Sequence, residues 1–106
     1  MNILFVCSRN IWRSPTAVAI YKDRQGHEFR SAGTEPSAKV RVSAKSILWA
    51  DMIFVMEKKH KLRLLYKFPN EIANKNMVIL DIEDEYKFMD EELIGMIRIS
   101  VDPYLL

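Results

Sequence analysis

The sequence predicts an α/β fold: a three-layer α/β/α sandwich with a four-stranded parallel sheet. Four short, mostly apolar segments of strand length alternate with segments in which apolar residues recur at helical spacing. Polar residues directly follow the apolar segments, as they do where strands end at the carboxyl edge of such a sheet. With 106 residues, of which 49% are hydrophobic, residues 1–106 are expected to form one domain with its own core.

The expected strands differ in how strongly the sequence marks them. Residues 2–7 form a continuous apolar run of the kind that is buried in parallel sheets. Residues 52–56 and 77–80 are similar runs, whereas residues 27–31 predict a shorter second strand that ends at Ala32-Gly33. Since helix-forming segments separate the strands, right-handed crossovers would place all four in one parallel sheet.

The first two helices are marked by residues that favour helix starts. Ser14-Pro15 opens the first helix, since proline is favoured in a first turn, and the helical pattern continues to Asp23. After a loop at residues 34–42, Ser43 is expected to cap a short second helix. The apolar residues of that helix are Ala44, Ile47, Leu48 and Trp49.

The third helix is basic. Residues 57–68 predict an amphipathic helix with Leu62, Leu65 and Tyr66 facing the core, and Pro69 is expected to end it. The basic run of this helix is a solvated face or, alternatively, a docking surface for an acidic partner or nucleic acid.

The carboxyl-terminal quarter of the chain is acidic, whereas the rest is basic. Residues 1–80 carry 14 basic and 6 acidic side chains, and residues 81–106 carry 2 basic and 8 acidic ones. The basic part has two interpretations. It attracts an anionic ligand or nucleic acid, or it is a solvated face.

The last helix opens with the acidic residues 90–92, where the helix dipole favours them. Its expected buried residues are Leu93, Met96, Ile97 and Val101.

The composition excludes several classes of protein. Cys7 is the single cysteine, which excludes an intrachain disulfide and a multi-cysteine zinc or iron–sulfur site. His27 and His60 stand alone in the sequence, so we expect no metal and no cofactor. No apolar run approaches the roughly 20 residues of a membrane span, and residues 3–6 are too short for a signal peptide. We therefore expect a cytoplasmic protein with no membrane partner.

The strongest functional signal is the spacing of Cys7, Arg13 and Ser14 around the first loop. Five residues separate the cysteine from the arginine, which lets a loop curl with its N–H groups inward, before a helix N-terminus. Arg13 would bind two phosphate oxygens as a fork, Cys7 would face the phosphorus, and Ser14 would donate a hydrogen bond that favours the thiolate. Alternatively, Cys7 is a buried core cysteine at a strand end. The expected substrate-binding residues are Ser8, Arg9, Asn10, Ile11, Trp12 and Ser14 around this loop, together with Tyr86.

Four segments of the chain match one family pattern. The first is the run Ile3-Leu4-Phe5-Val6-Cys7, followed by Asn10, Arg13-Ser14-Pro15 and Ala17. The others are Ser31-Ala32-Gly33-Thr34, the D-x-I-x-x-M pattern from Asp51 to Met56, and Ile82-Glu83-Asp84-Glu85-Tyr86. Together they resemble the low-molecular-weight protein tyrosine phosphatase family, most closely a compact bacterial branch of it.

The resemblance implies a phosphatase-type anion loop after strand 1 and a two-step reaction. Cys7 would attack a phosphate monoester and form a cysteinyl-phosphate, while Arg13 and the loop amides hold the phosphoryl group. Asn10 would shape the loop in a left-handed backbone conformation. An aspartate would protonate the leaving group and then activate the water that hydrolyses the intermediate.

Five positions depart from the family pattern, and two of them are Glu83 and Glu85, where the family has proline. Arg9 stands where the family has glycine, and it either adds positive charge at the pocket mouth or points to solvent. Trp12 replaces a second cysteine, so the protective disulfide of many members cannot form, and its ring is either a pocket wall or part of the core. Glu57 stands where an aspartate is usual.

Three aspartates are candidates for the general acid, which must lie within hydrogen-bond reach of the leaving group. Asp84 follows the fourth strand at the edge where the nucleophile lies, so we predict that it is the acid, with Asp81 next. Asp102 lies in a better D-P-Y match but comes after the last helix. Alternatively, residues 81–92 are a solvated acidic stretch. Tyr86 either flanks the pocket mouth or packs against the last helix.

We therefore predict a phosphomonoester hydrolase, specifically a protein tyrosine phosphatase, with Cys7, Arg13 and Asp84 as catalytic residues. Its partners would be a phosphorylated protein or a small phosphomonoester, with inorganic phosphate as product. The alternative is a phosphate- or phosphoprotein-binding module of the same fold with little or no turnover. An arsenate reductase would need an external thiol, and a nucleic-acid-binding domain would lack an aromatic stacking platform beside its basic helix.

Overall fold

The four predicted strands are present and form one parallel sheet. The computed structural model describes residues 1–105 of the chain. The strands lie in the order β2-β1-β3-β4, and every neighbouring pair runs parallel, as the alternation of strands and helices predicted. Their bounds are β1 (Asn2–Cys7), β2 (Glu28–Gly33), β3 (Met52–Val55) and β4 (Asn76–Ile79).

The second strand extends further than the sequence predicted. It includes Ala32 and Gly33, which pair in register with Val6 and Cys7 of β1. The strand therefore continues as far as its central neighbour does, and both strands end at the same edge of the sheet.

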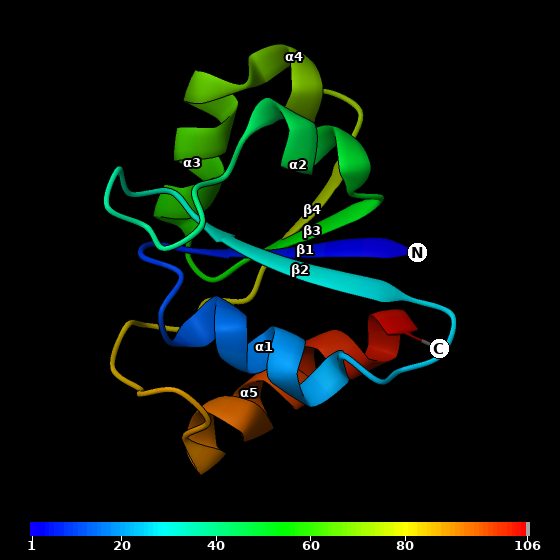
Figure 1. Ribbon diagram of the computed structural model, residues 1–106, viewed down its shortest axis with the longest axis vertical. Helices are drawn as coiled ribbons and strands as arrows, with labels where there is room; N and C mark the ends of the chain where they lie inside the picture. The colour runs from blue at the N-terminus through cyan, green and yellow to red at the C-terminus, as the bar shows by residue number, and fades with distance from the viewer. Residues whose placement is uncertain (106) are drawn as a thin grey trace.

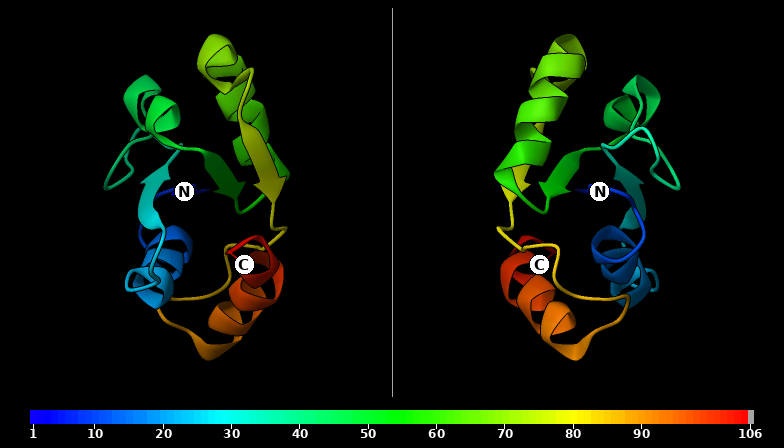
Figure 2. Two further views of the ribbon diagram at one scale, coloured as in Figure 1. Left: turned by 90° about the vertical axis from the view of Figure 1, so that its right-hand side faces the viewer. Right: turned by 90° about the vertical axis from the view of Figure 1, so that its left-hand side faces the viewer.

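Helices cover both faces of the sheet and complete the predicted three-layer sandwich. Figure 1 shows two helices below the sheet, α1 (Arg13–Tyr21) and α5 (Glu91–Val101). Three helices lie above it, α2 (Ala44–Trp49), α3 (Lys58–Lys67) and the short α4 (Pro69–Ile72). The two side views of Figure 2 show the same separation of the helices into two layers. Within residues 1–105 no helix is long and apolar enough to cross a membrane, since α5, the longest, has 11 residues.

Two short helical elements were not predicted. Pro69 ends α3, as expected, but it also takes the first position of α4, where its missing N–H and fixed φ are no disadvantage. A 3₁₀ turn, η1 (Asp102–Leu105), continues the chain beyond α5.

The central strand β1 supplies side chains to both halves of the core. Ile3, Phe5 and Cys7 pack on the side of α1 and α5, whereas Leu4 and Val6 pack on the side of α2, α3 and α4. All five are at most 2% exposed. Because side chains alternate along a strand, this arrangement places Cys7 on the face that α1 covers.

The predicted cap of α2 and the predicted face of α5 are confirmed. The side chain of Ser43 accepts a hydrogen bond from the backbone N–H of Ser46, which satisfies one free donor of the helix start. On α5, the residues that face the core are Leu93, Ile97 and Val101, with Met96 partly buried beside them.

The predicted face of α3 is wrong. Leu62, Leu65 and Tyr66 are 54%, 41% and 90% exposed, and the residues that α3 buries are His60 and Leu64. Both sets have helical spacing, so the apolar pattern alone fits either face. On the buried face, the backbone N–H of Glu57, just before α3, donates a hydrogen bond to the His60 ring.

Gly33, at the end of β2, lets the chain pack closely against the loop that follows β1. A methyl group at this position would lie 2.5 Å from the Ser8 carbonyl oxygen, 2.7 Å from Cβ of Ala38 and 3.0 Å from the Asn10 nitrogen. The two backbone contacts cannot give way without moving the loop. The absence of a side chain at Gly33 therefore fixes the position of the loop relative to the sheet.

Substitution of two glycines tests this packing. Gly33→Ala is expected to lower the free energy of unfolding by about 1–3 kcal/mol, because the added methyl group overpacks the loop. The matched control Gly95→Ala lies in α5 with no atom within 4 Å of the new methyl group, and it is expected to raise stability by about 0.5–1 kcal/mol. Urea unfolding measures both, and a Gly33→Ala protein as stable as the wild type would contradict the close packing.

Candidate active site

Three successive peptide groups of the loop between β1 and α1 are held in one orientation by residues 34–39. The carbonyl oxygens of Cys7, Ser8 and Arg9 accept hydrogen bonds from the N–H groups of Thr34, Glu35 and Lys39. The three carbonyls therefore point toward residues 34–39. Because C=O and N–H of a trans peptide point in opposite directions, the N–H groups of residues 8–10 point away from that segment.

Asn10 gives the loop its turn and connects it to the nucleophile. Its φ is 59°, in the left-handed region, as predicted. The Asn10 side chain donates a hydrogen bond to Ser14 Oγ (2.9 Å), and Ser14 Oγ lies 2.9 Å from Cys7 Sγ. Since Ser14 already accepts from Asn10, its hydroxyl proton is free to point at the sulfur. A hydrogen bond donated to sulfur favours the thiolate, which is the nucleophilic form.

Arg13 is buried with one edge of its guanidinium unpaired. The side chain is 1% exposed. Its Nη1 donates to Glu57 Oε2 (2.6 Å) and to the Ile82 carbonyl oxygen (2.8 Å), and Nη2 donates to Ser8 Oγ (3.3 Å). In the described residues Nε has no hydrogen-bond partner. The Nε edge therefore offers the two parallel donors that bind an oxyanion as a fork.

Glu57, to which the sequence analysis gave no role, forms the ion pair that holds Arg13. Burial opposes ionisation of this carboxyl, but the hydrogen bond and the positive charge of Arg13 outweigh it, so the pKa of Glu57 lies below its ordinary value. The signal that points to Glu57 is its position two residues after β3, the neighbour of the strand that carries the cysteine.

His60, which the sequence analysis placed on a solvated basic face, is fully buried beside the loop. One ring nitrogen, Nδ1, accepts from the backbone N–H of Glu57 (3.0 Å), and the other, Nε2, lies 2.9 Å from Ser8 Oγ. Burial, together with the charge of Arg13, lowers the pKa of His60 to about 4. The ring is therefore neutral at physiological pH.

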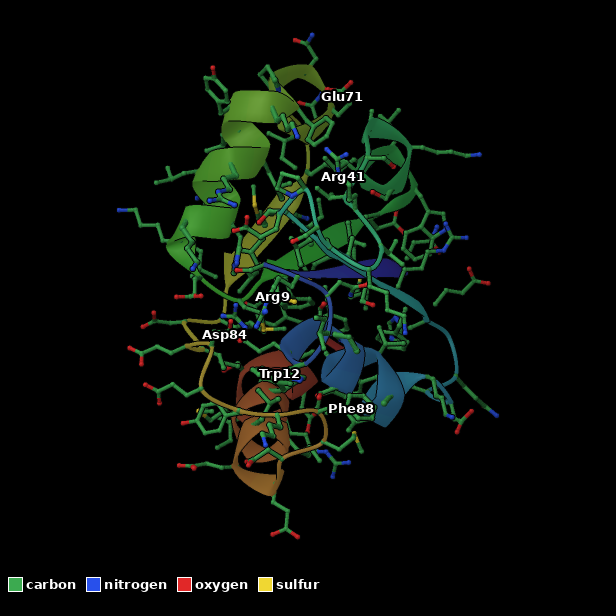
Figure 3. All side chains as sticks on the ribbon, turned by 60° about the vertical axis from the view of Figure 1, so that its left-hand side comes forward. Arg9, Trp12, Arg41, Glu71, Asp84 and Phe88 are labelled. Atoms are coloured by element: carbon green, nitrogen blue, oxygen red, sulfur yellow. The ribbon has the colours of Figure 1, made fainter. Side chains whose placement is uncertain are left out.

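The loop and the residues after β4 enclose a narrow pocket over the cysteine. Figure 3 shows Arg9, Trp12 and Asp84 gathered around the loop. The Asp84 carboxylate lies 3.6 Å from Arg13 Nε. The residues that line the pocket are Cys7, Arg9, Ile11, Trp12, Arg13 and Asp84.

The structure resolves the alternatives for three residues around this pocket. Trp12 is a half-buried pocket wall, not part of the core, and the guanidinium of Arg9 lies 5.6 Å from its ring centre at the mouth. Tyr86, predicted as a substrate-binding residue, does not line the pocket. Its ring packs against the core that includes Leu93, so the second alternative for Tyr86 is the one observed.

Only one of the three candidate aspartates borders the pocket. Asp84 lines it, whereas Asp102 accepts a hydrogen bond from the Tyr21 hydroxyl (2.6 Å) at the far end of α5. Asp81 is exposed in a turn with a φ of 60° and does not line the pocket. The position of Asp84 after the fourth strand was therefore a better guide to the carboxylate at the pocket than the D-P-Y match at Asp102. In residues 1–105 no group of three or more His, Cys, Asp or Glu side chains is placed to hold a metal ion.

Solved structures of phosphatases share the fold of this chain, although no protein-family model and no curated protein matches the sequence. The YwlE arginine phosphatase from Geobacillus stearothermophilus is 21% identical over 97% of this chain and 92% of its own, with a TM-score of 0.73. The tyrosine phosphatase Wzb from Escherichia coli K30, solved with phosphate, is 17% identical over 98% and 95%, with a TM-score of 0.77.

A third structure, Vibrio vulnificus Wzb with benzylphosphonate, is 20% identical over 98% of this chain and 96% of its own, with a TM-score of 0.79. A low-molecular-weight phosphotyrosine phosphatase from Vibrio cholerae O395 has a TM-score of 0.72 at 21% identity. At these identities the likeness concerns the course of the backbone. The chain has the fold of the low-molecular-weight phosphotyrosine phosphatases.

Proposed function

We propose that the protein is a cysteine-dependent phosphomonoester hydrolase that acts on phosphotyrosine in proteins. The observation that carries this proposal is the convergence on one pocket of the Cys7 thiol, the Asp84 carboxylate and Nε of Arg13, which makes no hydrogen bond within the described residues. A nucleophile, a fork of donors for an oxyanion and an acid are the parts that phosphoryl transfer through a thiol needs. The similar folds named above, which belong to tyrosine and arginine phosphatases, support the same class of reaction.

In the first step the thiolate of Cys7 attacks the phosphorus of the bound ester. A P–S bond forms while the ester P–O bond breaks, and Asp84 gives its proton to the leaving oxygen. Arg13 and the loop N–H groups stabilise the equatorial oxygens, where negative charge is concentrated in the transition state. The product is a cysteinyl-phosphate, and the dephosphorylated alcohol or phenol leaves.

In the second step water replaces the sulfur. Asp84, now a carboxylate, takes a proton from the water as it attacks phosphorus, and the P–S bond breaks. Inorganic phosphate leaves and the Cys7 thiolate is restored, with Ser14 placed to donate a hydrogen bond to it. Asp84 thus serves as acid and then as base, and its proton is regained within the cycle.

The ion pair between Asp84 and Arg13 explains how the substrate would prepare the acid. Without substrate, the Asp84 carboxylate lies 3.6 Å from Nε and is 36% exposed. A phosphoryl group bound at the Nε edge replaces this partner and brings its own negative charge beside Asp84. The Asp84 carboxyl group is then released from Nε and can face the leaving oxygen of the ester.

The walls of the pocket support an aryl phosphate as substrate. Ile11 is 46% exposed at the mouth, and Trp12 presents an aromatic face beside it. The positive charge of Arg9, which lines the pocket beside Trp12, favours an uncharged phenyl ring over a charged guanidinium. We therefore propose a phosphorylated protein or small aryl phosphate as the partner, inorganic phosphate as the product, and the reducing cytoplasm as the compartment that keeps Cys7 a free thiol.

One observation favours the alternative of a binding module. The general-acid loop lacks the prolines of the family pattern and carries Glu83 and Glu85 at those positions, so the loop is less restricted in conformation. If Asp84 is poorly held, the loop would still bind phosphate but turnover would be negligible.

Replacement of the nucleophile distinguishes the two functions. The wild type is expected to hydrolyse p-nitrophenyl phosphate near pH 6 and to give a phosphate adduct on Cys7 by mass spectrometry after acid quench. Cys7→Ser is expected to lose turnover and retain binding of inorganic phosphate, because the loop and Arg13 remain. Phosphate binding by a wild type that never releases product would establish the binding module instead. Faster turnover of phosphoarginine peptides than of phosphotyrosine peptides would contradict the substrate assignment.

A matched pair of aspartate variants tests the assignment of the acid. Asp84→Asn is expected to lower kcat by about 10²–10⁴-fold for phenyl phosphate and by less for p-nitrophenyl phosphate, whose better leaving group needs less protonation. Asp102→Asn is expected to leave kcat unchanged, because its carboxylate binds Tyr21 away from the pocket. Equal loss from the two variants, or loss from Asp102→Asn alone, would refute the assignment.

A further inference from the structure

The hydrogen bonds around His60 define its tautomer. The partner of Nδ1 is the backbone N–H of Glu57, which can only donate, so Nδ1 carries no proton. A neutral imidazole then has its proton on Nε2, where it is donated to Ser8 Oγ. His60 therefore accepts from one side of the site and donates to the other.

These two contacts are with the residues that hold Arg13. Ser8 Oγ accepts from Arg13 Nη2 as well as from His60, so both of its lone pairs are used. The Glu57 side chain accepts from Nη1, while its backbone is tied to the ring. The His60 ring thus forms a bridge between Ser8, which accepts from Nη2 of Arg13, and Glu57, which accepts from Nη1. Nε of Arg13 remains directed toward the pocket.

We propose that His60 is a positioning residue for Arg13, acting through Ser8 and Glu57 to aim the Nε edge at the phosphoryl site. His60 does not line the pocket, so it acts on the substrate only through the arginine. The inference rests on the proposed function for its effect on turnover, and on the anion site alone for its effect on phosphate binding.

Burial and the positive charges of Arg13, Lys59 and Arg63 keep the His60 ring neutral, against the negative charge of Glu57, and only the neutral ring can make both hydrogen bonds. Arg13 faces it from α1, Glu57 from the turn before α3, and Lys59 and Arg63 from its own helix. A proton on Nδ1 would oppose the Glu57 N–H and add a second positive charge next to Arg13. Protonation of His60 would therefore break the bridge at the Glu57 end.

The pH dependence of stability tests whether the ring is neutral. An unfolded histidine titrates near 6.5, whereas burial lowers the pKa of His60 to about 4 in the folded protein. Between these values the unfolded chain binds a proton that the folded one does not, so stability falls as pH falls from about 6.5 and the loss ends near pH 4. From pH 7.5 to 5 the folded-to-unfolded ratio is expected to fall about 30-fold further in the wild type than in His60→Gln. Leu64→Ala, which destabilises the same layer without removing a titratable group, is the control and should show the pH dependence of the wild type.

Two variants, His60→Gln and His60→Asn, each keep one of the two hydrogen bonds of the His60 ring. In His60→Gln the side-chain amide can still donate to Ser8, whereas in His60→Asn the shorter side chain can serve Glu57 but does not reach Ser8. We expect His60→Asn and Ser8→Ala each to weaken binding of inorganic phosphate about tenfold, the value of one hydrogen bond, and His60→Gln to retain most of it. The double variant His60→Asn/Ser8→Ala should be no weaker than Ser8→Ala alone, since Ser8→Ala already removes the hydrogen bond from His60.

Leu64→Ala is the control for loss of stability alone. Leu64 lies one turn further along α3 and is buried in the same layer, but it is not among the hydrogen-bond partners of the loop. It should lower the unfolding midpoint and leave the dissociation constant for phosphate and kcat/KM unchanged. Calorimetric titration with inorganic phosphate and assays with p-nitrophenyl phosphate provide both readouts.

The outcomes separate this inference from the proposed function. Wild-type affinity in both His60→Asn and Ser8→Ala would overturn the positioning role, even if the enzyme is active. A wild type that binds phosphate but does not turn over would overturn the proposed function, while loss of affinity in His60→Asn would still support the role of His60. A wild type that neither binds phosphate nor hydrolyses an aryl phosphate would overturn both.

Discussion

A buried positive charge is the constraint on which the site depends. Arg13 is 1% exposed, and removing a guanidinium from water costs several kcal/mol unless it is paired and hydrogen-bonded. Its partners come from the loop after β1, the residue after β3 and the segment after β4, namely Ser8, Glu57 and Ile82. Those three chain segments must converge for the arginine to be buried. The same contacts that offset the cost of burial also determine which edge of the guanidinium is left for a ligand.

The sheet order brings these segments together. In the order β2-β1-β3-β4 the carboxyl ends of β1, β3 and β4 are neighbours, so the nucleophile, the partner of the arginine and the acid loop reach one edge although they are distant in sequence. The end of β2 supports the loop from the other side, where Gly33 allows close backbone contact. Helices on both faces of the sheet contribute residues to the site. On one face α1 presents Arg13 and Ser14, and α3 supplies His60 from the opposite layer.

The sequence predicted the features that depend on local pattern. Spacing along one loop was enough for Cys7, Arg13 and Ser14, the family resemblance supplied Asn10, and position after a strand placed Asp84 at the pocket. Contacts between distant segments were missed, because a lone histidine and a glutamate in a basic stretch carry no local sign of a buried network. The face of α3 was predicted wrongly for the same reason. Two sets of residues fit helical spacing, and the buried set is the one in which His60 accepts a hydrogen bond from the backbone N–H of Glu57. Tyr86 was misplaced because nothing in a short loop indicates which way a ring turns.

A crystal structure with bound vanadate tests the central claim most directly. The account predicts vanadium next to Cys7 Sγ, two of its oxygens on Nε and Nη2 of Arg13, and Nη1 still bound to Glu57. It also predicts that the Asp84 carboxylate moves off Nε to face the apical oxygen. An anion bound elsewhere, or an Arg13 that leaves Glu57 to reach it, would show that the buried ion pair does not prepare the site.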